Sequence, residues 1–102
     1  MLVKIHKSYR NLVAICDSDL IGKKFEEKFE KGIKLLDLRE SFYKGEEKTY
    51  KETIEIIKKQ SPEDSTFSIV GKESIKAAKE AEIITKHGVK KIHGIPYALV
   101  LL

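Results

Sequence analysis

The most constraining stretch of the sequence is the apolar run Leu12–Cys16, which turns abruptly polar at Asp17, Ser18 and Asp19. A continuous apolar run suits a strand covered on both faces better than a strand with one face in solvent. Asp and Ser often cap helix N-termini by accepting backbone N–H bonds. The sequence therefore predicts a buried strand that leads into a helix capped by Asp17. Their junction should lie at the carboxyl end of the sheet, where open α/β folds tend to bind ligands.

The rest of the chain alternates between strand and helix patterns. Strands are expected at Leu2–His6, Leu12–Cys16, Ile33–Leu38, Thr66–Val70, Val89–Ile92 and Tyr97–Leu102. A first helix is expected between Asp17 and Gly32, because Ile21, Phe25 and Phe29 recur every four residues. Further helices are expected from about Glu46 to Gln60, and between Ser74 and His87.

This order, β-β-α-β-α-β-α-β-β, sets the expected fold class. Helix-separated strands favour parallel crossovers, whereas hairpins at the ends favour antiparallel pairs. We therefore predict one domain, residues 1–102, of the α/β class bordering on α+β. It should contain three helices and a mixed sheet of about five or six strands.

Composition places the chain among cytoplasmic proteins. The only cysteine, Cys16, excludes an internal disulfide and suits a reducing cytosol. No signal-peptide pattern is present, and no apolar run approaches the ~20 residues of a membrane helix. Lys, Glu and Ile are abundant while Asn and Gln occur once each, which is typical of heat-adapted proteins. An AT-rich genome would also raise Asn, so heat adaptation is the favoured explanation.

The net charge of +4 is concentrated at the two ends of the chain, and the middle is mildly acidic. Lys7, Tyr9 and Arg10 lie in the first predicted hairpin, and Lys90 and Lys91 lie near the C-terminus. If both groups share one surface, they would suit an RNA backbone, with the tyrosine available for stacking. If they lie apart, they are ordinary solubilising charges.

Cys16 and Asp17 are the first candidates for chemistry. A thiol near a helix N-terminus can become a nucleophile, although a carboxylate beside it opposes thiolate formation. The simpler interpretation makes Cys16 a small core residue and Asp17 a helix cap. Glu46 is a third catalytic candidate. His6, His87 and His93 lack the spacing of metal ligands, so we expect no metal site, and no cofactor motif is complete.

Two further segments could border a ligand crevice with Asp17. Phe42–Glu47 contains two adjacent aromatics, which would form either a lip over a pocket or a plug that seats a helix. Gly71–Ser74 follows a strand and opens a helix, a geometry whose backbone N–H groups can hold an anion. The candidate ligand-binding residues are Asp17, Lys23, Tyr43, Gly45, Glu46, Gly71 and Ser74.

Four segments together resemble an archaeal domain family of unknown function, whose members are mostly short stand-alone proteins. They are Ile15–Lys23, Phe42–Glu46, Ile69–Gly71 and Gly94–Ile95–Pro96, and they follow one another in the family's order. The family has Gly-Glu where this chain has Gly71–Lys72–Glu73, and a more polar ending after Pro96. The resemblance implies a fold and an archaeal cytosolic setting, but no reaction.

Three functions follow from these features. The leading hypothesis is a non-enzymatic binding module for RNA or a ribonucleoprotein, because the chain's ends are basic and no catalytic set is complete. The second is a small enzyme, or a protein that binds an anionic metabolite or nucleotide, using the crevice at the strand-to-helix junctions. The third is a structural homodimer formed through the apolar C-terminal strand Tyr97–Leu102.

Overall fold

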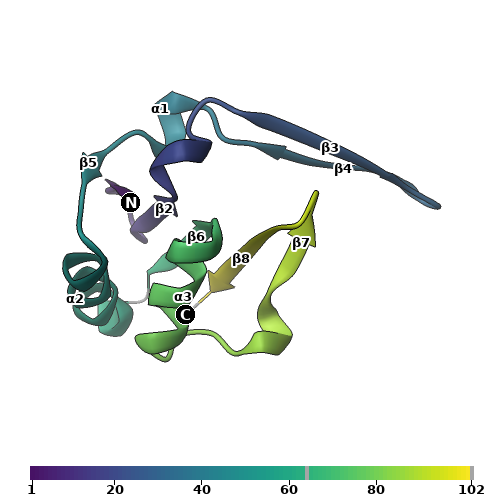
Figure 1. The fold of residues 1–102 in the computed structure, drawn as a ribbon. Helices are drawn as coiled ribbons and strands as arrows, with labels where there is room; N and C mark the ends of the chain where they lie inside the picture. The colour runs from purple at the N-terminus through teal and green to yellow at the C-terminus, as the bar shows by residue number, and fades with distance from the viewer. Residues whose placement is uncertain (64, 102) are drawn as a thin grey trace.

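A six-stranded mixed sheet forms the centre of the computed structural model, which describes residues 1–63 and 65–101 (Figure 1). The strand order is β5-β1-β2-β6-β8-β7. The strands are β1 (Leu2–His6), β2 (Leu12–Cys16), β5 (Glu46–Glu47), β6 (Thr66–Val70), β7 (Lys90–Ile92) and β8 (Ile95–Leu101). Strands β2 and β6 are parallel, and the other neighbouring pairs are antiparallel. Three helices, α1 (Glu40–Tyr43), α2 (Tyr50–Gln60) and α3 (Lys72–Glu80), complete the predicted fold class, which is confirmed.

Strand β2 is buried on both faces, as its sequence predicts. It lies between β1 and β6. Val13 and Ile15 face the layer formed by α2 and α3, whereas Ala14 and Cys16 face the opposite layer. All four side chains have 0% exposure. Because both faces are covered, alternation of polar and apolar residues is absent from this strand.

The two faces of the sheet are covered unequally (Figure 1). Helices α2 and α3 pack on one face, where Ile57, Ile75 and Ala78 join the core. The other face carries the short helix α1 together with Leu36 and Leu38, which pack near β2. On this second face the outer part of β8 remains uncovered. We call this side of the sheet the open face.

Helices α2 and α3 are shorter than predicted. Helix α2 begins at Tyr50 because Thr49 and Glu52 form a capping box, with Glu52 N donating to Thr49 Oγ1 at 3.1 Å. The residues expected in its first turn form β5 instead. Helix α3 ends at Glu80, and the left-handed backbone of Glu82 (φ 63°) prevents the helix from continuing.

The helix predicted from Ile21, Phe25 and Phe29 is wrong. Residues Lys24–Phe29 form β3, which pairs with β4 (Gly32–Asp37) in a separate two-stranded sheet. Residues four positions apart lie on one face of a helix. Because side chains alternate between the two faces of a strand, residues an even number of positions apart, such as Phe25 and Phe29, also lie on one face of a strand. Opposite charges face each other across the ribbon at the pairs Lys24–Asp37 and Glu27–Lys34.

Residues 24–37 therefore form a β-hairpin that projects from the body of the protein, here called the arm (Figure 1). The strand predicted at Ile33–Leu38 exists, but it is not buried along its length. Leu36 is buried where the arm joins the body, whereas Ile33 is 59% and Leu35 is 55% exposed. The last residue of the predicted strand Tyr97–Leu102, Leu102, lies outside the described residues.

Candidate functional site

The carboxyl ends of β2 and β6 meet at one edge of the sheet because these strands are parallel. Asp17 follows β2, and Gly71 follows β6 as the N-cap of α3. One oxygen of Asp17, Oδ2, accepts from Glu73 N at 3.1 Å. The other, Oδ1, accepts from Ser74 N at 2.9 Å and from Ser74 Oγ at 2.7 Å. The Asp17 carboxylate thus caps α3 from the neighbouring strand.

Gly71 is required for this contact. Its φ of +111° is a conformation that side chains with a Cβ rarely adopt. A Cβ at this position would also lie 2.2 Å from Asp17 Cγ. The close approach of the two chains therefore depends on glycine.

This geometry corrects two expectations from the sequence. Asp17 was expected to cap the helix after it, but the single 3-10 turn Ser18–Leu20 receives no side-chain bond from Asp17. The backbone N–H groups at Gly71–Ser74 could have held an anion, but Glu73 N and Ser74 N donate to the protein's own Asp17 carboxylate, and Gly71 N donates to the Pro96 carbonyl at 2.8 Å. A ligand at this helix N-terminus would have to displace Asp17, which carries the same charge as the anion expected there.

Cys16 is fully buried on the open-face side of β2. Burial, and then the neighbouring Asp17 carboxylate, raise the pKa of the thiol to about 12. The thiol is therefore protonated at neutral pH. Its burial also keeps the sulfur out of contact with solvent. These are the properties of a core residue rather than of a nucleophile.

The two adjacent aromatic residues, Phe42 and Tyr43, pack as a plug that seats a helix, the second of the two arrangements considered for Phe42–Glu47. Tyr43 is buried, and its hydroxyl shares a 2.8 Å hydrogen bond with Ser68 Oγ. Phe42 stacks on His6, with ring centroids 4.8 Å apart, and the His6 ring nitrogen Nε2 lies 2.8 Å from the Phe42 carbonyl oxygen. These contacts fix α1 against β1, which contains His6, and β6, which contains Ser68. Both residues also border a shallow depression beside β4.

Gly45 and Glu46 continue the chain along the edge of β1. A Cβ at Gly45 would lie 2.0 Å from the Val3 carbonyl oxygen, so only glycine allows the chain to pass. Glu46 is exposed and forms an ion pair with Lys48 at 2.8 Å. The exposed Lys23 lies at the base of the arm, where its carbonyl accepts from Leu38 N at 2.9 Å.

The structure does not gather these candidates around one crevice. Asp17, Gly71 and Ser74 are in direct contact. Tyr43 instead borders a depression beside β4, and Gly45 and Glu46 border another beneath the edge of β1.

The two basic groups of the chain lie at opposite ends of the sheet. Lys7, Tyr9 and Arg10 belong to the turn between β1 and β2, at the end where β2 begins. Lys90 pairs with Tyr97, which pairs with Val70 at the end where β6 finishes. Strands β2, β6 and β8 separate β1 from β7. The two groups therefore do not form one continuous surface.

A third basic group was not singled out in the sequence. A depression of about 370 Å³ lies between α3 and the β7–β8 hairpin, and we call it the basic groove. Four lysines line it: Lys72, Lys76, Lys79 and Lys91. The floor of the depression is apolar and includes Ile75, Val89 and Pro96. Lys91 faces this groove with Pro96, whereas Lys90 pairs with Tyr97 on the open face. The spacing 72, 76, 79 places three lysines on one face of a helix and could have been noticed in the sequence.

Within residues 1–63 and 65–101, no three His, Cys, Asp or Glu side chains are grouped as metal ligands. None of the helices in the same part of the chain is both long enough and apolar enough to cross a membrane.

The fold and this edge of the sheet define a small α+β domain with a mixed sheet and a helix capped across parallel strands. The chain belongs to the family described as protein of unknown function (DUF424), which it matches over residues 6–102. It is also similar to the crystal structure of an uncharacterized conserved protein from Methanopyrus kandleri. The TM-score is 0.78 and the identity 24%, with 98% of this chain and 90% of the other covered. No curated protein is significantly similar in sequence.

Proposed function

We propose that the protein is a non-enzymatic RNA-binding module whose principal contact is the basic groove. The observation that carries this proposal is the placement of Lys72, Lys76, Lys79 and Lys91 around one depression. Lys79 follows Lys72 by seven positions along the helix, a rise of about 10 Å. A row of ammonium groups of this length suits successive phosphates of a nucleic-acid backbone better than one compact anion.

The surroundings of the groove favour an extended polyanion over a small anion. The apolar floor formed by Ile75, Val89 and Pro96 offers contact for sugars or bases. Two backbone donors at the start of α3 that could hold a single phosphate, Glu73 N and Ser74 N, are bound to Asp17. A nucleotide or anionic metabolite is therefore the second candidate.

The turn between β1 and β2 is a separate, secondary contact in this proposal. Tyr9 is fully exposed, with a relative accessibility of 107%, and Lys7 and Arg10 flank it. An exposed aromatic ring beside cations can stack on an unpaired base. Because the turn lies at the far end of the sheet from Lys91, an RNA that contacts both would have to run the length of the domain.

The test is fluorescence anisotropy with labelled single-stranded and duplex RNA at several salt concentrations. The triple variant Lys72→Glu/Lys76→Glu/Lys91→Glu should weaken binding at least tenfold. It should also reduce the salt slope, by about one unit for each phosphate that a lysine no longer neutralises. The triple variant Lys51→Glu/Lys58→Glu/Lys59→Glu is the matched control, since it changes the same charge at exposed positions on α2.

Equal effects of the two triple variants would show that net charge alone drives binding. That result would overturn the proposal that the basic groove is the binding site. Binding that is insensitive to salt, or absent at low salt, would overturn RNA binding itself. A thermal shift with nucleotides or phosphate, without RNA binding, would favour the second candidate. The variant Tyr9→Ala tests the secondary contact and should weaken binding to single-stranded RNA more than binding to duplex RNA.

A further inference from the structure

We propose that two copies of this chain form a symmetric dimer in which the arm of each copy adds to the edge of β8 of the other. Such a dimer does not depend on RNA binding. Its basis is a pair of apolar surfaces that the structure leaves uncovered, one on the arm and one on β8.

The first surface is the arm. Ile33 and Leu35 lie on one side of the ribbon and are 59% and 55% exposed, and Phe29 on the other side is 46% exposed. A two-stranded hairpin is only marginally stable by itself in water. Apart from its base, where the His93 ring contacts Glu26 backbone and Phe25, the arm extends away from the body (Figure 1).

The second surface is the outer edge of β8. Strand β7 pairs with β8 only over Ile95–Tyr97. Among the described residues, no strand continues this pairing on the outer side of residues 98–101. Leu99 and Leu101 are 65% and 69% exposed on the open face. An apolar strand edge of this kind readily pairs with another strand.

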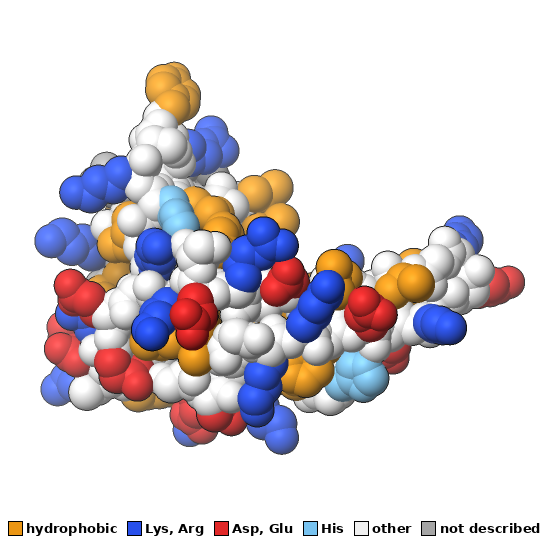
Figure 2. Space-filling view, turned by 90° about the horizontal axis from the view of Figure 1, so that it is seen from above, with side chains coloured by type: hydrophobic (Ala, Val, Ile, Leu, Met, Phe, Trp, Pro, Cys, Tyr) orange, Lys and Arg blue, Asp and Glu red, His pale blue; other side chains and the backbone are white. Residues whose placement is uncertain are grey.

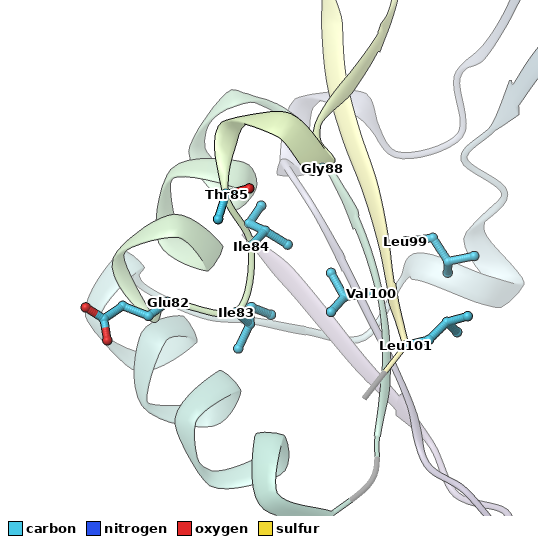
Figure 3. Close-up of a pocket in the computed structure, with 8 residues that line it drawn as sticks. All are labelled: Glu82, Ile83, Ile84, Thr85, Gly88, Leu99, Val100 and Leu101. Atoms are coloured by element: carbon cyan, nitrogen blue, oxygen red, sulfur yellow. The ribbon is translucent and has the colours of Figure 1, made fainter.

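The opposite side of this edge is hollowed. A depression of about 370 Å³ lies between β8 and residues 82–88 and is lined by Ile83, Ile84 and Val100. Figure 3 shows Val100 pointing toward Ile83 and Ile84, while Leu99 and Leu101 point the other way. An incoming strand, whose side chains alternate between its faces, would therefore find apolar partners on both sides.

The two surfaces match each other in arrangement. If the arm lies along this edge, Ile33 and Leu35 can face Leu99 and Leu101. Phe29, on the other face of the arm, then lies on the same side of the edge as Ile83. Figure 2 shows an L-shaped molecule with hydrophobic side chains on both the body and the projecting arm. A two-fold axis can thus engage both surfaces of both copies at once, which closes the assembly.

The charge of the arm favours a second copy over a nucleic acid or an anionic membrane. The arm carries four lysines, Lys24, Lys28, Lys31 and Lys34, and four acids, Glu26, Glu27, Glu30 and Asp37. Such a balanced surface gives no net attraction to a polyanion.

The size is also adequate for a stable dimer. The arm contributes two six-residue strands and their turn, and residues 82–85 and 98–101 form the receiving edge. Together they approach the ~20–30 residues per side of a stable interface.

Sedimentation equilibrium of the full chain at about 50 µM tests this proposal. We expect the wild type to have the mass of a dimer. Either Leu35→Lys or Leu99→Lys should raise the dissociation constant of the dimer at least tenfold. The control Tyr9→Lys introduces the same charge at an exposed aromatic residue that belongs to neither surface, and it should remain dimeric. A monomeric wild type overturns the proposal, as does a dimer that neither leucine variant weakens.

A cross-linking experiment fixes the pairing. Leu35→Cys and Leu99→Cys variants, mixed in the presence of a short bis-maleimide, should link to each other. Neither variant should link to itself, and Cys16 does not compete because it is buried. Linkage of Leu35→Cys to itself would indicate that arm pairs with arm and would contradict the arm–β8 interface.

Discussion

Asp17 and Ser74 are joined by two hydrogen bonds to a single carboxylate oxygen, one from Ser74 N at 2.9 Å and one from Ser74 Oγ at 2.7 Å. Ser74 is fully buried, and 57 positions separate the two residues in sequence. The contact locks the end of β2 to the start of α3. It also fills the place that the sequence suggested for a ligand.

Loss of this cap should destabilise the protein. Asp17→Ala removes the acceptor for three donors, including the hydroxyl of buried Ser74, and should lower the free energy of unfolding by about 1–3 kcal/mol. Asp17→Asn keeps an acceptor oxygen and should cost less. Urea denaturation measures both, with exposed Asp19→Ala as the control, expected within about 0.5 kcal/mol of wild type. An equal effect of the Asp17 and Asp19 variants would contradict the assigned cap.

The bond between Tyr43 and Ser68 should be measurable as a coupling energy. Tyr43→Phe and Ser68→Ala each remove one partner of the 2.8 Å bond and should each cost about 1 kcal/mol. The double variant should cost less than the sum, because the second substitution has no bond left to break. A double-mutant cycle from chemical denaturation provides the measurement. Strict additivity would mean that the hydroxyls do not interact in solution.

Gly45 should tolerate no side chain. Gly45→Ala places a Cβ against the backbone of Val3 and should destabilise the protein by about 1–3 kcal/mol or more. Gly88→Ala is the matched control, because nothing lies within 4 Å of its added Cβ. Thermal unfolding of the two variants should rank them clearly. Similar melting temperatures would show that β5 does not hold the chain against β1.

Cys16 should be inert in the native state. With its pKa raised to about 12, the thiol is protonated at pH 8 and should react with a maleimide only after unfolding. Because the native pKa exceeds the ordinary value of 9.0, the stability linked to this group is present below pH 9.0 and is lost as the pH rises toward 12. Cys16→Ala should therefore show a smaller loss of stability across that range. Rapid labelling of the folded protein would contradict the burial.

Several features of the fold could be predicted because they depend on neighbours in sequence. The apolar run Leu12–Cys16 requires cover on both faces, whatever the rest of the chain does. Thr66–Val70 has the residue types of a strand and forms β6 with the predicted bounds. The capping box of Thr49 and Glu52 is also a local pattern, but the helix was predicted to begin at about Glu46, before this cap. The arm could not be predicted from the recurrence of Ile21, Phe25 and Phe29 every four residues, because that interval fits one face of either a helix or a strand.

The candidate sites divide in the same way. Three lysines at helical spacing, Lys72, Lys76 and Lys79, are visible in the sequence, but only strand order brings Lys91 beside them. The sequence alone determined which segments are apolar, charged or able to turn, since these are properties of neighbouring residues. The tertiary structure decided that Asp17 caps α3, and it placed Lys7 and Lys91 at opposite ends of the sheet. Such contacts depend on strand order and direction, which are set by the packing of the whole chain and not by any local pattern.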